Sequence, residues 1–203
     1  MVKSKNTEEK ILDSAREIFM MKGFEGARMQ EIADHAGINK ALLHYYFRSK
    51  EKLFASIFNK ILSQIGPAML TFINEEIPLE VKIWKFVDSY LELMKKFPRM
   101  PLFIINEISI NPERIIGHLN FSDFLDLRKL EKILHDEHGK GRIIAVDVKH
   151  FIVNIIGLTV FPLAAKIIIQ RNLQIQNDEW HQFIEERKKV IPETIMGWLK
   201  NMD

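Results

Sequence analysis

The sequence predicts an all-α protein, and three observations lead to this fold class. Apolar residues recur at intervals of three and four along most of the chain, which places them on one face of a helix. Glycine and proline separate these runs and mark the expected turns between helices. No stretch of the sequence alternates polar and apolar residues as a half-buried strand does, and no internal repeat is present.

The first helix is expected to start at an N-cap, Thr7, and to end at Gly23. Glu8 and Glu9 follow the cap in the first turn, where acidic side chains interact favourably with the positive end of the helix dipole. Its apolar stripe is typical of a core-facing helix and comprises Ile11, Leu12, Ala15, Ile18 and Phe19. Residues 1–6 are short, basic and polar, and we expect them to form a disordered arm.

Two short helices are expected within residues 28–54. The first carries Met29 and Ile32 at helical spacing and is closed by Gly37. Asn39 stands where an N-cap belongs, before the second helix over residues 40–47. Such a pair buries little by itself, but its geometry is suited to placing the second helix in a DNA major groove.

The second short helix carries side chains that can contact DNA. Lys40, Tyr45 and Tyr46 can donate hydrogen bonds to phosphates or base edges. Ser49 then caps a further helix, and Lys50 adds a positive charge to the N-terminal turn, which attracts phosphate. An alternative is that the two tyrosines pack in a core and Lys50 is solvated. The glycine-turned helix pair in front of them favours DNA contact.

The rest of the chain predicts further helices. The first is a long helix over 50–73, bent or broken at Gly66 and Pro67 because proline removes a backbone donor. The later helices are expected at 79–97, 101–109, 112–138, 147–170 and 178–199.

Composition limits the class of protein. The 203 residues are 47% hydrophobic, enough for a globular core, and the net charge of +2 gives no bulk attraction to nucleic acid. The absence of cysteine excludes disulfides and thiolate zinc sites and agrees with the cytoplasmic location that we expect. The N-terminus lacks the apolar core of a signal peptide. The most apolar run, 151–169, contains Asn154, Pro162 and Lys166, so we interpret it as a buried helix and not as a membrane span.

The segment ILDSAREIFMMKGFEGARMQEIADHAGINKALLHYYFRSKEKLF resembles the DNA-binding domain of the tetracycline-repressor (TetR) family of bacterial regulators. The resemblance implies an N-terminal three-helix helix-turn-helix DNA-binding domain, residues 1–52, followed by a helical effector-binding and dimerisation domain, residues 53–203. It further implies a dimer that binds a pseudo-palindromic operator in double-stranded DNA. The implied function is a repressor released by a small, mainly hydrophobic effector, without a cofactor.

The resemblance also implies roles for single residues. Base contacts are expected from Gln30, Lys40, Ala41 and Leu42, and phosphate contacts from Arg28, Tyr45, Tyr46 and Lys50. One departure concerns the start of the second helix, where the family usually has threonine or serine and this chain has Ala27 and Arg28. Arg28 either replaces the lost phosphate contact or pairs with Glu31.

The last two long helices are expected to form a dimer interface. The first is apolar most of the way round, so it must be covered on more than one side. The interface residues expected from both helices are Phe151, Ile155, Phe161, Trp180, Phe183, Ile184 and Ile191. The alternative is that these helices only close the core of their own subunit.

The middle of the chain is expected to hold the effector pocket, because ligand pockets are mostly apolar with a few polar groups. The expected lining residues are Trp84, Tyr90, Phe103, Glu107 and Phe121. For each of them a place in the ordinary core is an open alternative. A DNA-binding protein of this fold without a small-molecule effector, controlled by protein partners, would have a collapsed middle domain. In a pure interaction module, four side chains would be packed away from the surface: Lys40, Tyr45, Tyr46 and Lys50.

Enzymatic and metal-binding functions are not expected. His135 and His138 are three residues apart and lie beside acidic residues, a spacing that could bind a metal. They are expected at the C-terminal end of a helix, however, where histidine interacts favourably with the helix dipole. The sequence contains no nucleophile elbow, phosphate-binding glycine loop or paired-histidine zinc motif.

Overall fold

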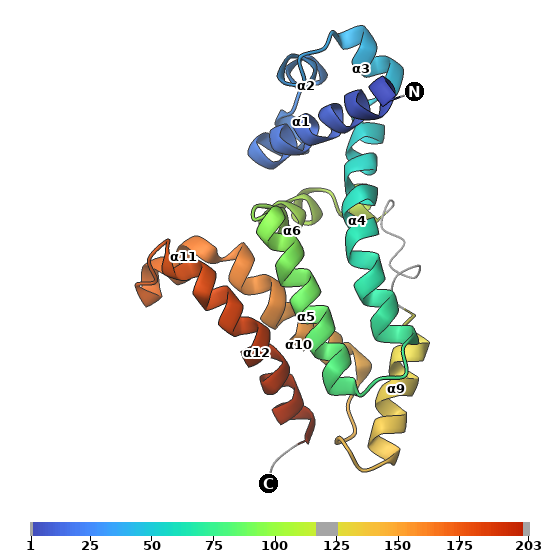
Figure 1. The fold of residues 1–203 in the computed structure, drawn as a ribbon, viewed down its shortest axis with the longest axis vertical. Coiled ribbons are helices and arrows are strands. Elements are labelled where there is room, and N and C mark those ends of the chain that lie inside the picture. Colours follow the sequence, from blue (N-terminus) through green and yellow to red (C-terminus); the bar gives the residue numbers. More distant parts are fainter. Residues whose placement is uncertain (1, 117–125, 201–203) are drawn as a thin grey trace. The chain divides into compact units, whose positions relative to one another are not determined.

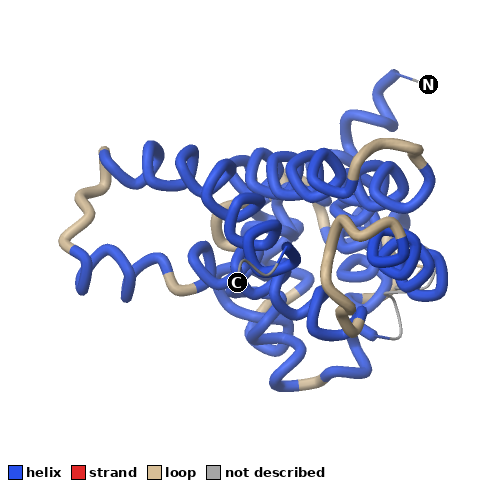
Figure 2. The backbone as a smooth tube through the Cα atoms, turned by 90° about the horizontal axis from the view of Figure 1, so that it is seen from below, coloured by secondary structure: helices blue, strands red, loops and turns tan. Residues whose placement is uncertain are grey.

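The computed structural model describes the backbone of residues 2–116 and 126–200, and this part of the chain consists of helices and loops without strands (Figure 2). The helices are α1 (Val2–Gly26), α2 (Met29–His35), α3 (Lys40–Tyr46), α4 (Lys50–Asn74), α5 (Leu79–Lys96), α6 (Met100–Ile110), α7 (Pro112–Ile116), α9 (Leu127–Gly139), α10 (Val148–Ala164), α11 (Lys166–Leu173) and α12 (Glu179–Lys200) (Figure 1). The all-α prediction is therefore confirmed. The chain folds as two compact units, one of Met1–Ser63 with Phe103–Leu119 and one of Gln64–Leu102 with Asn120–Asp203.

The first unit packs α1, α2, α3 and the start of α4 around an aromatic centre. The predicted stripe of α1 is buried as expected. The ring of Phe54, on α4, lies within 6.0 Å of the rings of Phe19, Phe24, Phe58 and Phe103, measured between centroids. The last of these comes from α6, so this unit takes in residues beyond the expected boundary at 52.

Three local expectations about the helices were wrong. Residues 2–6 continue α1 and do not form a separate arm. The long helix α4 is not broken at Gly66 and Pro67 but continues to Asn74. Buried residues on both sides of the proline anchor the helix, and packing of this kind outweighs local preference. The helix expected over 112–138 is not continuous, because Asp126 is extended (φ −76°, ψ 98°) and its carboxylate caps α9.

The second unit is built around α5, α10 and α12, which lie side by side (Figure 1). α12 runs along α5, while α10 contacts α5, α9 and α12. The buried residues that join these helices are Ile83, Val87, Leu91, Leu130, Leu134, Phe151, Ile155, Trp180, Ile184, Ile191, Ile195 and Leu199. Among the described residues no single helix is long and apolar enough to cross a membrane; α10 and α11 together have the length, but they meet at a bend of 76°.

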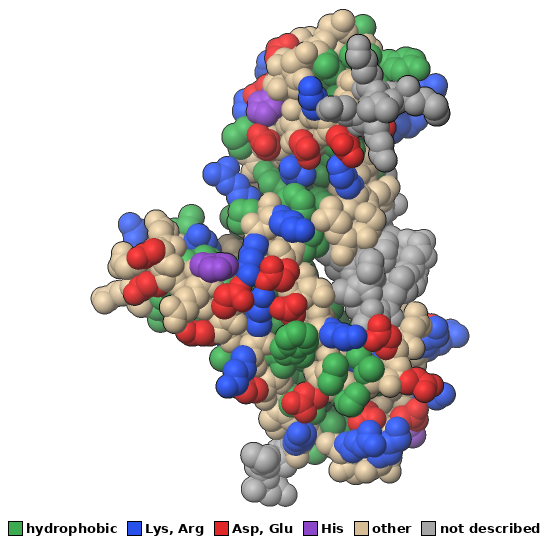
Figure 3. Space-filling view, in the orientation of Figure 1, with side chains coloured by type: hydrophobic (Ala, Val, Ile, Leu, Met, Phe, Trp, Pro, Cys, Tyr) green, Lys and Arg blue, Asp and Glu red, His purple; other side chains and the backbone are tan. Residues whose placement is uncertain are grey.

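A network of ion pairs joins α5 to α12 at the surface, where acidic and basic side chains alternate (Figure 3). Lys188, on α12, pairs with Asp88 at 3.1 Å and with Glu92, both on α5. It also pairs with Glu185, one turn earlier in α12, at 3.0 Å, and Lys95 bonds both glutamates. Hydrogen bonds from the two lysines lower the pKa of Glu92 from 4.5 to about 2.

We expect Lys188→Met to raise the pKa of Glu92 towards its ordinary value, because the largest of the contacts that lower it is lost. In the wild type, a carboxylate with a lowered pKa stabilises the fold fully above pH 4.5 and loses this contribution as the pH falls towards 2. With the substitution, the free energy of unfolding should depend less on pH between pH 4.5 and about 2. Carboxyl chemical shifts followed through an acid titration measure the change.

The matched control is Lys189→Met, which removes the same charge from a side chain that is mostly exposed and pairs with Glu193. It should leave the pKa of Glu92 low. An equal rise in both variants would mean that general charge, and not the hydrogen bonds of Lys188, lowers this pKa.

Candidate DNA-binding interface

The two short helices predicted for DNA reading are present and joined by a tight turn. Gly37, with φ of +67°, turns the chain after α2. The side chain of Asn39 then caps α3, because its Oδ1 accepts a hydrogen bond from the Leu42 amide at 2.8 Å. Ile32, on α2, and Leu43, on α3, are completely buried and pack the pair into the core of the first unit. The turn and the cap follow the sequence prediction.

The four residues expected to contact bases have exposed side chains. Gln30 lies in the first turn of α2, and its amide donates a hydrogen bond to Asp34 at 2.8 Å. Lys40, Ala41 and Leu42 form the first turn of α3. The face that would enter a groove is therefore open. A pure interaction module would have Lys40 packed away from the surface, together with Tyr45, Tyr46 and Lys50, whereas Lys40 is exposed.

The residues expected to contact phosphates differ in their surroundings. Arg28 is exposed. Tyr45 is 80% exposed, and its ring meets that of Tyr46 edge to face at 5.5 Å. These three side chains are accessible or partly accessible, as a contact with DNA requires.

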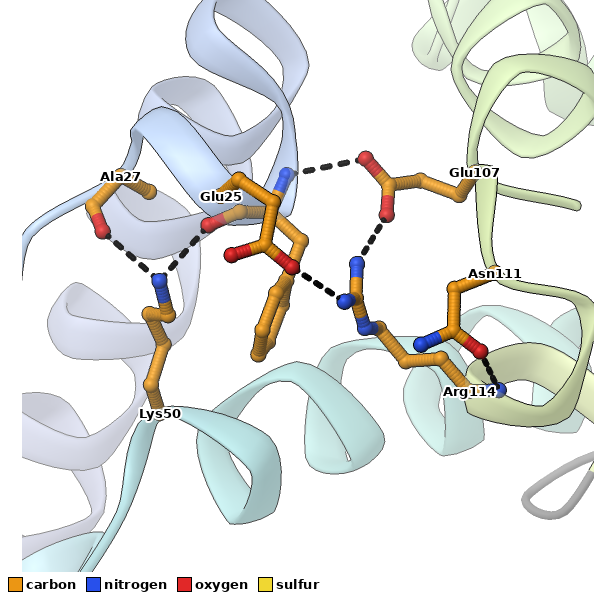
Figure 4. A network of polar contacts seen from close by, with 7 residues as sticks. Glu25, Ala27, Lys50, Glu107, Asn111 and Arg114 are labelled. Atoms are coloured by element: carbon orange, nitrogen blue, oxygen red, sulfur yellow. Dashed lines mark hydrogen bonds and ion pairs between the residues drawn. The ribbon is translucent and has the colours of Figure 1, made fainter. Parts of the chain in front are cut away.

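Lys50 has a structural role that the sequence did not indicate. Its ammonium donates hydrogen bonds to the carbonyl oxygens of Phe24, at 2.9 Å, and Ala27, at 3.2 Å (Figure 4). It also lies 4.4 Å from the centre of the Phe24 ring. These carbonyls lie where α1 ends, where a helix leaves acceptors without partners. Two of the three ammonium hydrogens are thus used within the protein, so the phosphate contact that the resemblance implies would have to use the third.

The start of α2 lacks a side-chain cap. Arg28 is extended (φ −115°, ψ 137°), as an N-cap residue should be, but its side chain makes no capping hydrogen bond. Glu31, the alternative partner expected for Arg28, pairs instead with Lys22. Arg28 itself is exposed.

We expect Arg28→Thr to stabilise the protein by about 1 kcal/mol, since a threonine hydroxyl can accept from the open amides of α2. If Arg28 contacts a phosphate, the same change weakens DNA binding on all sequences and lowers the salt slope by about 0.9. Urea unfolding and salt titration of binding measure the two effects. Arg28→Ala is the control, because it removes the charge without adding a cap. Equal stability of the two variants would contradict the capping argument.

The five residues expected to line an effector pocket do not come together. Trp84 is half exposed on α5, whereas Tyr90 is largely buried on the same helix. Phe103 and Glu107 belong to the first unit, where one packs in the aromatic centre and the other bonds the Phe24 amide. Phe121 lies outside the described residues. The expected pocket was wrong for this set, because residues close in sequence are divided between two cores.

The second unit instead contains a small apolar cavity of about 40 Å³. Its lining carries no polar surface and consists of Phe72, Phe86, Leu130, Phe151, Ile152, Ile155 and Ile156. Tyr90 stacks on Phe86 with ring centres 6.3 Å apart, and burial raises the pKa of its hydroxyl to about 12. The cavity is thus formed by α4, α5, α9 and α10.

Most residues expected at a dimer interface lie in the core of the second unit. Five are buried by the helices of their own chain: Phe151, Ile155, Trp180, Ile184 and Ile191. Phe183 is partly buried, and Phe161 is 62% exposed. A buried side chain cannot face a partner, so the expectation needs correction for those five. The exposed apolar side chains of α10 and α12 are instead Val153, Ile156, Phe161 and Val190.

Sequence reasoning missed a contact to the DNA-binding helices from α6 and α7. Glu107 accepts a hydrogen bond from the Phe24 amide at 2.9 Å and pairs with Arg114, also at 2.9 Å (Figure 4). No local pattern indicates it, because 83 positions separate the acceptor from the amide. Among the described residues, no group of three or more histidine, aspartate or glutamate side chains could hold a metal ion.

Comparison with known proteins agrees with this geometry. Residues 11–57 match the family of bacterial regulatory proteins, tetR family. The chain is 26% identical over 142 residues to the HTH-type transcriptional regulator RutR of Escherichia coli K12, a match that covers 70% of this chain and 66% of RutR, just under two thirds. It is 39% identical over 62 residues to the HTH-type transcriptional repressor NicS of Pseudomonas putida, covering 30% and 29% of the two chains.

Solved structures show the same fold over nearly the whole chain. HlyIIR, a hemolysin II transcriptional regulator, matches with a TM-score of 0.65 and 22% identity over 98% of this chain and 99% of its own. The fatty acid degradation regulator FadR of Bacillus halodurans matches with a TM-score of 0.70 and 17% identity, covering 96% and 97%. The solved structures show the fold, and the helix-turn-helix with the family match shows that the chain belongs to the TetR family of transcriptional regulators.

Proposed function

We propose that the protein is a dimeric, sequence-specific DNA-binding repressor. The observation that carries this proposal is the open first turn of α3, where Lys40, Ala41 and Leu42 are exposed on a helix held by a side-chain cap and a buried apolar face. A rigid helix with accessible donors and small apolar groups is suited to reading base edges in the major groove. Exposed Arg28 and Tyr45 would set its register on the phosphate backbone.

A second copy of the chain is part of the proposal. The net charge of +2 gives little attraction to DNA, so one reading helix alone would bind weakly. Two copies related by a two-fold axis would place their reading helices about one DNA turn apart, roughly 34 Å, on a pseudo-palindrome. The exposed apolar residues of α10 and α12 supply a surface that a second copy could cover.

The experiment that tests DNA reading is selection of bound fragments from a random DNA pool by the purified protein at physiological salt. We expect enrichment of a pseudo-palindrome. Lys40→Ala and Gln30→Ala should then relax the preference at single base pairs by about 1–3 kcal/mol each. A folded protein that enriches no sequence would contradict the proposal.

We further propose that a small, mainly apolar effector releases the DNA by opening the cavity of the second unit. The entirely apolar lining supports this chemistry. At about 40 Å³ the cavity is much smaller than the apolar cavity of roughly 150 Å³ that is known to bind benzene. A ligand must therefore favour a more open conformation, and its effect on DNA binding is limited by its preference for that state.

The small volume also favours a second candidate, a regulator of the same fold controlled by protein partners. A series of straight-chain fatty acids of increasing length separates the two, and FadR, whose name refers to fatty acid degradation, makes this series a reasonable first choice. Release of operator DNA by a member of this series would favour the effector. DNA binding that no apolar compound changes would favour protein partners.

A further inference from the structure

Phe24 is held from several directions at the end of α1. Its amide donates a hydrogen bond to Glu107 Oε1 at 2.9 Å, and its carbonyl oxygen accepts one from Lys50 at 2.9 Å. Its ring lies between two cations, with the guanidinium carbon of Arg114 3.8 Å and the Lys50 ammonium 4.4 Å from its centre. Both polar groups of one peptide residue are thus bound by side chains from distant parts of the chain (Figure 4).

The two residues from α6 and α7 form a closed arrangement with little access to water. Glu107 is 2% exposed, and its second oxygen, Oε2, accepts from Arg114 at 2.9 Å. The other terminal nitrogen of Arg114 pairs with Glu25, and its backbone amide is capped by Asn111 at 3.2 Å. A buried carboxylate requires this full set of donors, because an unpaired charge in the interior is costly. The position of the Phe24 amide is therefore defined by α6 and α7.

This contact fixes the connection between α1 and α2. Beyond Phe24 the next fixed point is the carbonyl oxygen of Ala27, which accepts from Lys50 at 3.2 Å, and α2 begins two residues later at Met29. The direction in which α2 leaves α1 determines the positions of the residues that are expected to contact bases, Gln30 on α2 and Lys40 to Leu42 on α3. Base contacts require accurate placement of side chains, whereas attraction to phosphates tolerates displacement.

We propose that Glu107 and Arg114 are positioning residues for sequence-specific DNA recognition, acting through the Phe24 peptide without contacting DNA. The inference rests on the proposed function. It predicts that loss of the contact reduces binding to the operator while binding to random DNA is retained. A role in stability alone would lower the amount of folded protein and change both kinds of binding in proportion.

The test compares Glu107→Met, which removes both acceptors at similar side-chain length, with Glu107→Gln, which keeps an acceptor for the Phe24 amide. We expect Glu107→Met to weaken operator binding about tenfold or more, since a hydrogen bond to a charged group is lost, and to change binding to random DNA less than about twofold. Amide hydrogen exchange of Phe24 should accelerate. Glu107→Gln should recover most of the operator affinity and the protection of this amide.

The matched control is Glu113→Met, which makes the same change of charge and side chain at an exposed position of α7. It should leave the ratio of operator to random binding unchanged. If Glu107→Met does not fold, Arg114→Lys replaces it, because lysine keeps the charge but cannot bridge Glu107 and Glu25 as the guanidinium does.

The outcomes separate the inference from the function on which it rests. Unchanged operator affinity with a rapidly exchanging Phe24 amide, or a proportional loss on both DNAs, overturns the inference alone, provided that the wild type selects an operator. A wild-type protein that prefers no sequence overturns the proposed function and the inference with it. Selective loss in Glu107→Met and recovery in Glu107→Gln support both.

Discussion

Replacing Phe151 by alanine is expected to destabilise the protein by about 3–5 kcal/mol, the range typical of a large aromatic side chain removed from a core. The side chain is 1% exposed, and its ring lies 6.1 Å from that of Phe72. It also lines the existing apolar cavity, so its removal enlarges that space and does not allow the neighbours to close around it. Urea unfolding followed by circular dichroism measures the loss.

Phe161→Ala provides the matched control on the same helix. The wild-type side chain is 62% exposed, so its removal should leave the stability of the subunit within about 0.5 kcal/mol of the wild type at low concentration. If a second copy covers this face, the variant should instead associate more weakly in sedimentation experiments. A large loss of subunit stability, with unchanged association, would show that Phe161 belongs to the core and that the dimer surface lies elsewhere.

Gly23→Ala is expected to destabilise the first unit by about 1–3 kcal/mol, because Gly23 has a conformation that other residues rarely adopt (φ 69°, ψ 174°). A methyl group here would also lie 3.3 Å from Glu107 Oε1, so the buried carboxylate would have to move. Both effects act at the kink that Gly23 makes within α1. Stability is measured by urea unfolding, and the position of the kink by exchange of the Phe24 amide.

The control for this change is Gly37→Ala. Gly37 has a similar φ of +67°, but a methyl group added there would meet no described atom within 4 Å. It should therefore carry the backbone strain without displacing a neighbour, and the Phe24 amide should stay protected. Equal effects of the two variants on that amide would mean that the approach of Glu107 to Gly23 is unimportant.

The helix-turn-helix could be predicted from the sequence because its signals are local. The cap at Asn39, the turn at Gly37 and the apolar spacing of α2 each act within a few residues, and each appears where expected. The exposure of the reading face follows, since the buried positions leave only one side open. Local chemistry is sufficient when an element is short and its ends are marked.

The dimer face and the effector pocket could not be predicted in the same way. α10 is apolar nearly all round, so periodicity does not distinguish Phe151, which is buried, from Phe161, which is exposed. The pocket residues failed for a different reason: the boundary between the two units falls within α6, and Phe103 lies beyond it. Both outcomes depend on how distant helices pack, which a single sequence does not specify.

The assembly of the first unit from Met1–Ser63 and Phe103–Leu119 has a consequence for how the protein is made. During synthesis the reading helices leave the ribosome first, but Glu107 and Arg114 follow more than eighty residues after Phe24. Synthesis proceeds at roughly 5–20 residues per second, so Glu107 and Arg114 are added several seconds after the helices that they contact. For the same reason, a chimera that takes its DNA-binding domain from a relative must include that relative's counterpart of Phe103–Leu119 as well as that of Met1–Ser63.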